Sequence, residues 1–116
     1  MSVIRHRDQS ETNGYRPIIG KAAGAHATTL WDQSLPPGAA TITHYHECKE
    51  THTFLSGSAE VTIHGETFLV EADSSVLIPA RAIHQIRNTT PGYVRLLAFF
   101  STNEPEVIAS DMPIVS

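Results

Sequence analysis

The apolar residues of this chain come in short runs, and turn-forming residues separate most of the runs. The clearest are YRPIIG, HATTLW, THTFLSG, AEVTIHGETFLVEAD, SVLIPA and YVRLLAFF. Several alternate apolar and polar residues, which puts the apolar side chains on one face of an extended strand. No stretch of about a dozen residues has the apolar period of an amphipathic helix. Many short strands with regular turns predict an all-β sandwich or barrel.

Length and composition limit the chain to one domain with one core. It has 116 residues, of which 41% are hydrophobic, and this suffices for a single core. Acidic and basic residues are mixed, the formal net charge is -4, and there is no basic run. Nucleic acid and anionic membrane surfaces are therefore not expected partners. A small molecule is the expected partner.

The single cysteine, Cys48, excludes an intramolecular disulfide and a zinc site built from several thiolates. The N-terminal residues lack the apolar core of a signal peptide, and no segment reaches the roughly 20 apolar residues of a membrane span. The sequence therefore predicts a soluble protein of the cytoplasm.

Three segments differ in pattern along the chain. Residues 1–14 are polar and aperiodic and are expected to form an N-terminal arm. Residues 15–101 are expected to form the barrel, and residues 102–116 a C-terminal tail that packs on it. Inside the barrel, His64-Gly65 joins two alternating runs as a tight hairpin, where glycine allows a positive φ. In the tail, a helical turn could follow Pro105.

A polar segment, GAATITHYHECKETHTFLSG, interrupts the apolar pattern at residues 38–57. If its first half is a strand, His44 and His46 share a face with Ile42, because side chains alternate along a strand. The residues that follow them read as a short turn. Two imidazoles would then point toward the same interior as an apolar side chain.

The second half of the segment returns as another strand. Glu50 and His52 would share a face with Phe54. Burying a carboxylate among imidazoles is costly unless the charge is paired or bound to a metal. The segment is therefore either a set of metal ligands or an ordinary polar surface on an antiparallel ribbon.

The spacing of this segment resembles the first signature of the cupin superfamily, G-x5-H-x-H-x3-E-x6-G. The five matching positions are Gly38, His44, His46, Glu50 and Gly57. Five such matches arise by chance about once in ten million starting points, since each residue type is only a few per cent of a sequence. The chain is thus similar to a small single-domain cupin.

The second cupin signature, G-x5-P-x-G-x2-H-x3-N, is matched in part, at Pro79, His84 and Asn88. Asp73 and Arg81 stand where glycines are usual. Aspartate can adopt the left-handed conformation that glycine supplies at a turn. Arg81 either takes another turn type or brings a guanidinium near the mouth of the barrel.

The resemblance implies a double-stranded β-helix, a small jelly-roll barrel that holds one divalent transition metal. The implied ligands are His44, His46, Glu50 and His84. Three imidazoles and one carboxylate suit Fe, Mn, Ni, Co, Cu or Zn, and suit Ca or Mg poorly. If the ion takes six ligands, two positions remain for water, substrate or dioxygen.

Other side chains are candidates for the surroundings of the metal. Ile42, Phe54 and Ile86 are expected in the pocket wall or the core, and Arg81 is a candidate at the mouth. His52 is a candidate general acid or base, a partner that orients a ligand, or a hydrogen-bonded core residue.

Two classes of function follow from the resemblance. One is a metal-dependent enzyme on a small organic molecule, either an oxygenase or an isomerase, lyase or cyclase that uses the metal as a Lewis acid. The other is a non-catalytic module that binds a small ligand or has a structural role. The presence of four implied metal ligands favours the enzyme over the non-catalytic module, because a purely structural barrel would have an apolar interior at lower cost. The resemblance also implies a homodimer.

Overall fold

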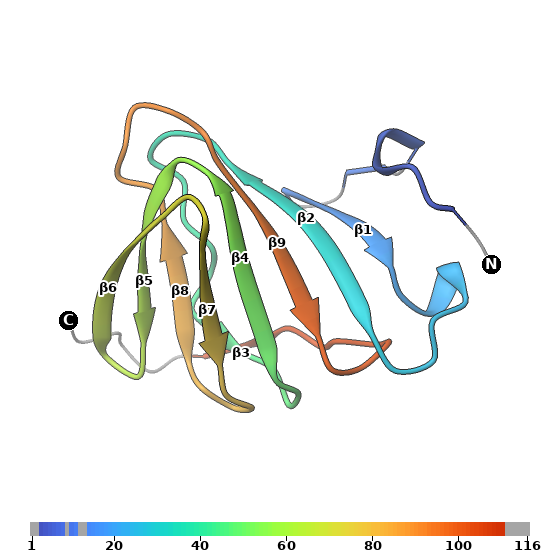
Figure 1. Cartoon of the computed structure of the whole chain (residues 1–116). Coiled ribbons are helices and arrows are strands. Elements are labelled where there is room, and N and C mark those ends of the chain that lie inside the picture. The colour runs from blue at the N-terminus through green and yellow to red at the C-terminus, as the bar shows by residue number, and fades with distance from the viewer. Residues whose placement is uncertain (1–2, 9, 12–13, 111–116) are drawn as a thin grey trace.

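The computed structural model describes residues 3–8, 10–11 and 14–110 (Figure 1). The remaining positions of the predicted N-terminal arm, 1–2, 9 and 12–13, and of the predicted tail, 111–116, lie outside the described residues. The described part contains no α-helix. It therefore has no helix that is long and apolar enough to cross a membrane. It contains two short 3-10 helices, η1 (His6–Asp8) and η2 (Lys21–Ala23).

Within the described residues, ten strands form two antiparallel five-stranded sheets that face each other. The first sheet has, in spatial order, β1 (Tyr15–Ile19), β2 (Thr29–Leu35), β9 (Val94–Phe100), β4 (Glu50–Ser56) and β7 (Ser74–Ile78). The second has β10 (Ile108–Ala109), β3 (His44–Tyr45), β8 (His84–Arg87), β5 (Ser58–Ile63) and β6 (Glu66–Glu71). This arrangement confirms the predicted all-β jelly-roll barrel.

The space between the sheets is divided into an apolar part and a polar part. The larger apolar cluster consists of Leu35, Phe54, Ala59, Val61, Val70, Ile86, Val94 and Leu96. A smaller cluster, formed by Trp31, Ala98 and Phe100, lies on β2 and β9. The buried polar side chains include four histidines and Glu50. The apolar clusters provide the hydrophobic driving force for closing the barrel around these polar groups.

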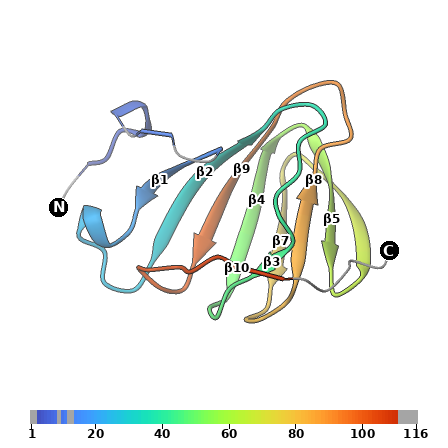
Figure 2. The ribbon, with the colours of Figure 1, turned by 180° about the vertical axis from the view of Figure 1, so that it is seen from behind.

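The chain after β9 forms a strand and not the predicted helical turn. Ile108 and Ala109 pair with Tyr45 and His44 at the edge of the second sheet. Figure 2 shows this segment crossing the lower end of the first sheet before it reaches β10. The expectation of a helical turn after Pro105 is therefore wrong, because pairing with a distant strand outweighs the local preference of a short segment.

Two residues at cupin glycine positions adopt the left-handed conformation. Asp73 has φ 64° and Arg81 has φ 65°. The hairpin at His64-Gly65 also has positive φ at both residues, 48° and 80°, as a type I′ turn requires. The expected turn role of Asp73 is confirmed, and Arg81 adopts the same left-handed backbone conformation.

The last residue of the second signature, Asn88, holds a turn. Its side chain is fully buried, and its Nδ2 donates to the carbonyls of Leu35 (3.0 Å) and Gly92 (2.8 Å). Its Oδ1 accepts from the backbone N–H of Thr90 at 2.9 Å. Asn88 therefore fixes the connection between β8 and β9 and has no place in the polar interior.

The strain at Asp73 leads to a prediction about stability. Asp73→Gly should unfold at a higher denaturant concentration than Asp73→Ala, by about 1 kcal/mol of unfolding free energy, because only alanine has a Cβ that crowds this backbone conformation. Urea unfolding of both variants measures the difference. Equal stabilities would show that φ 64° carries no cost at this turn.

Candidate metal centre

Five polar side chains named from the sequence meet inside the barrel. His44 lies on β3, His46 follows that strand, Glu50 and His52 lie on β4, and His84 begins β8. Their exposed fractions run from 0% to 8%. His44 and His84 are directly paired across the second sheet, and β4 delivers its two side chains from the facing sheet. The two sheets therefore close over one polar cluster.

Two separations between potential ligand atoms match those of donors around one ion. The Oε1 atom of Glu50 lies 3.1 Å from Nε2 of His84 and 3.4 Å from Nε2 of His46. One ring nitrogen from each of His44, His46 and His84 falls in a group whose members all lie within 4.8 Å of one another. Donors bound at about 2.1 Å to one ion are separated by about 3.0 to 3.4 Å in octahedral or tetrahedral geometry.

Backbone carbonyls fix the orientation of the three histidines. The Nδ1 atoms of His44, His46 and His84 lie 2.7–2.8 Å from the carbonyl oxygens of Ile42, Glu106 and Ala82. A carbonyl only accepts, so each Nδ1 carries the proton and donates. In a neutral ring this leaves the lone pair on Nε2, the atom that a metal can bind.

Several atoms that face one another in this cluster lack hydrogen bonds. The Nε2 atoms of His46 and His84 and the Oε1 atom of Glu50 are buried without a hydrogen-bond partner. Buried polar atoms are normally satisfied, and such atoms call for a ligand or a bound ion. Two Nε2 lone pairs close to one carboxylate oxygen fit a divalent cation.

The electrostatics of the cluster favour the ligand forms of these residues. Burial lowers the pKa of His44 to about 4, and the adjacent His84 adds to the effect. Burial also lowers the pKa of His46. Burial alone would raise the pKa of Glu50, but attraction to His52 and the hydrogen bond that His52 donates, with smaller contributions from His84, bring it below the usual range. At neutral pH, His44 and His46 are therefore neutral and Glu50 is ionised.

These pKa directions predict acid sensitivity of the metal-free protein. Its unfolding free energy should fall as the pH drops from about 6.5 to about 4, because the unfolded chain protonates His44 near 6.5 and the folded chain only near 4. Within this window the unfolded state binds more protons, so acid favours unfolding. Urea unfolding in the presence of a chelator, at several pH values across the window, measures the slope.

Two variants control this measurement. His44→Gln removes the titrating ring and should flatten the dependence of stability on pH. His26→Gln changes an exposed histidine and should keep the wild-type dependence. If the unfolding free energy of His44→Gln depends on pH as that of the wild type does, the lowered pKa of His44 is not the cause of the acid sensitivity.

Aromatic packing around His46 was not predicted from the sequence. The ring centroid of His46 lies 4.9 Å from that of Phe100 and 6.5 Å from that of Trp31, both in edge arrangements. Trp31 also stacks on Tyr15 at 4.0 Å. The only tryptophan of the chain, at the end of the run HATTLW, was a possible signal. The contact between His46 and the backbone carbonyl of Glu106 had no signal in the sequence, because every residue type has a backbone carbonyl.

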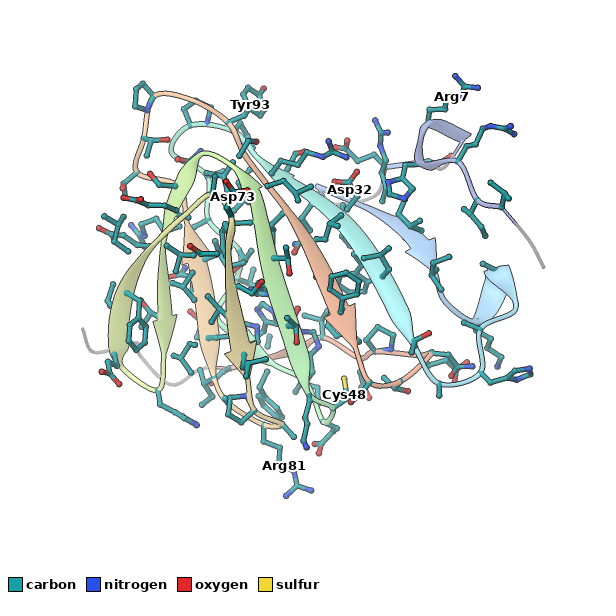
Figure 3. All side chains as sticks on the ribbon, viewed as in Figure 1. Arg7, Asp32, Cys48, Asp73, Arg81 and Tyr93 are labelled. Atoms are coloured by element: carbon teal, nitrogen blue, oxygen red, sulfur yellow. The ribbon has the colours of Figure 1, made fainter. Side chains whose placement is uncertain are left out.

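Two candidates for the surroundings of the metal are wrong. Ile42 is 59% exposed, because residues 41–43 do not continue β3 as a strand and the alternation of faces is lost there. The Arg81 side chain is 76% exposed and donates to Glu47 at 2.8 Å. Figure 3 shows Arg81 pointing away from the barrel. The other two candidates, Phe54 and Ile86, lie in the larger apolar cluster.

Comparison with known proteins identifies a family and two curated relatives. The family model described as "Cupin domain" matches residues 31–100. The chain is 30% identical to auxin-binding protein 1 of Arabidopsis thaliana over 87 residues, which cover 67% of this chain and 44% of that protein. It is 32% identical to polyketide synthase CurC of Streptomyces cyaneus over 71 residues, covering 60% and 46%. The chain thus spans less than half the length of these two curated relatives.

Solved structures show the same fold. The polyketide cyclase RemF from Streptomyces resistomycificus has a TM-score of 0.81 and 21% identity, with 97% of this chain and 87% of that chain covered. The oxalate decarboxylase of Lactobacillus farciminis has a TM-score of 0.79 and 23% identity, with 89% and 34% covered. These likenesses show a shared fold. The family match over residues 31–100 shows that the chain belongs to the cupin domain family.

Proposed function

We propose that this chain is a metal-dependent cupin enzyme that acts on a small organic molecule. One divalent transition metal would be held by His44, His46, Glu50 and His84. The observation that carries this proposal is the orientation of the three imidazoles. Each Nδ1 donates to a backbone carbonyl, which leaves the lone pair on Nε2. The Nε2 atoms of His46 and His84 lie beside a buried carboxylate oxygen without hydrogen bonds.

The donor set and the structural neighbours support a transition metal. Three imidazoles and one carboxylate are donors for Fe, Mn, Ni, Co, Cu or Zn. One structural neighbour, the oxalate decarboxylase of Bacillus subtilis, is described with Mn(II) centres, and its TM-score with this chain is 0.77. A six-coordinate ion with four protein ligands has two open coordination positions. Open positions are typical of catalytic sites.

For the reaction, we favour Lewis-acid chemistry on a carbonyl compound, of the cyclase or isomerase type. A metal held in this centre would polarise a carbonyl oxygen. Support comes from the similarity to polyketide synthase CurC at 32% identity and from the fold shared with the cyclase RemF over most of both chains. An oxygenase is the second candidate, since the same ligand set suits iron.

The burial of the cluster favours a further alternative. The most exposed of the proposed ligands, His44, is only 8% exposed, which limits the access of a substrate. A module that binds a small ligand without turnover, or a barrel in which the metal has a structural role, would tolerate such a closed site.

Two measurements test the proposed function. Metal analysis of the purified protein should find close to one transition metal per chain. The metal-loaded protein is then incubated with a linear β-polyketone, catechols and sugar acids, under air and under argon, and products are identified by mass spectrometry. Metal-dependent conversion of the β-polyketone in both atmospheres supports the cyclase or isomerase.

The other outcomes are distinct. Conversion only under air supports the oxygenase. Saturable binding of a probe without turnover supports the binding module. Protein without bound metal, whose melting temperature is unchanged by a chelator, contradicts the metal centre itself. His84→Ala serves as the matched control in the turnover assay, because it removes a proposed ligand and leaves the outer surface intact.

We also propose a homodimer located in the cytoplasm, with a small molecule as the partner of the site. The structure leaves large apolar side chains exposed, among them Leu77 at 77% and Phe99 at 42%. Sedimentation velocity at several protein concentrations measures the mass in solution. A monomer at all concentrations would contradict the homodimer.

A further inference from the structure

His52 lies beside the proposed metal ligands but has a different hydrogen-bond arrangement. It is two residues after Glu50 on β4, on the same face, and is 1% exposed. Its Nε2 lies 2.7 Å from Oε2 of Glu50. Its neighbours across the sheet are Val76 on β7 and Ala98 on β9. An apolar side chain would fill this position at a lower desolvation cost, so the histidine needs an explanation.

The two oxygens of the Glu50 carboxylate have different surroundings, because only one of them contacts His52. Oε2 accepts a short, charge-assisted hydrogen bond from His52. Oε1 faces the Nε2 atoms of His46 and His84, at 3.4 Å and 3.1 Å, without hydrogen bonds. One oxygen is therefore occupied by the protein and the other is free to bind an ion.

We propose that His52 is a positioning residue, which holds Oε2 of Glu50 so that the carboxylate binds the metal through Oε1 alone. This inference rests on the proposed metal centre. Single-oxygen binding by Glu50 uses one coordination position where a carboxylate bound through both oxygens would use two. His52 thereby preserves an open position for a substrate.

The position of the proton separates this role from that of a ligand. An ionised carboxylate only accepts, so Nε2 of His52 must carry a proton to bond Oε2. A protonated Nε2 has no lone pair for a metal. His44, His46 and His84 carry their protons on Nδ1, the opposite arrangement. The Nδ1 atom of His52 is buried without a hydrogen-bond partner, so no backbone carbonyl holds a proton there.

The first part of the test uses the metal-free protein. Long-range proton–nitrogen NMR correlations assign the proton on each imidazole ring. The expected result is a proton on Nε2 of His52 and on Nδ1 of His44, His46 and His84. A His52 ring protonated only on Nδ1 overturns the inference, whether or not the wild-type protein binds a metal.

The second part compares two substitutions by titration with Co²⁺. His52→Phe keeps an aromatic ring without a donor, and should lower the Co²⁺ affinity by about 10- to 100-fold and change the visible spectrum, as loss of a partner of a ligand does. His52→Gln places an amide N–H at the same number of bonds from the backbone, and should restore the affinity and the spectrum. Circular dichroism and the melting temperature confirm that both variants fold.

The outcomes separate this inference from the proposed function. Wild-type affinity and spectrum in His52→Phe, or equal losses in both variants, overturn the positioning role. A wild-type protein that does not bind Co²⁺ contradicts the proposed metal centre, and the NMR assignment in the metal-free protein then decides the position of His52 by itself.

Discussion

His84→Ala and His46→Ala should each lower the affinity for a divalent transition metal by more than about 100-fold. Loss of a residue that only orients a ligand typically costs 10- to 100-fold, and loss of a ligand should exceed that. The two effects should be similar, because the Nε2 atoms of both histidines face the same Glu50 oxygen, at 3.1 Å and 3.4 Å. Isothermal titration with Co²⁺ or Zn²⁺, and metal analysis of the purified variants, measure the change.

The control is His26→Ala, which removes an exposed histidine and should keep full metal occupancy. Unchanged occupancy in His84→Ala would show that the second cupin signature does not supply a ligand. Equal loss in His26→Ala would indicate binding of metal to surface histidines. Circular dichroism of the metal-free variants is needed, because both substituted side chains are buried.

The faces of the candidate ligands could be predicted where a strand is regular. On β4, Glu50, His52 and Phe54 are buried, as alternation along the strand predicts. The same rule failed for Ile42, because the segment before β3 is irregular. There the Ile42 carbonyl accepts from Nδ1 of His44 at 2.7 Å. Local pattern cannot reveal such an irregularity, since the residue types still alternate.

Contacts between distant segments could not be predicted from the sequence. The Glu106 carbonyl that orients His46 lies 60 positions further along the chain, and it belongs to a tail whose residue types gave no clear pattern. Arg81 illustrates a related limit. Its signature position predicted the location of a turn, but the direction of the side chain depends on Glu47, a partner 34 positions away.

Gly57→Ala should destabilise the fold far more than Gly38→Ala, although both glycines belong to the first signature. Both have positive φ, 77° and 78°, so the backbone strain of alanine is the same, about 1–2 kcal/mol. A Cβ on Gly57 would lie 2.5 Å from the carbonyl oxygen of Tyr93 and 3.1 Å from Cα of Val94, whereas a Cβ on Gly38 would meet nothing within 4 Å. Overpacking adds about 1–3 kcal/mol.

The unfolding free energy of Gly57→Ala should therefore fall by about 3 kcal/mol, and that of Gly38→Ala by about half as much. Urea unfolding of both variants measures the difference. Gly57 lies at the opposite end of β4 from Glu50, so folded Gly57→Ala should still bind Co²⁺ with wild-type affinity. Equal losses of stability would show that the conformation alone requires glycine at both positions. A larger loss in Gly57→Ala shows that this glycine allows the close approach of the backbone before β9, which completes the barrel around the proposed metal centre.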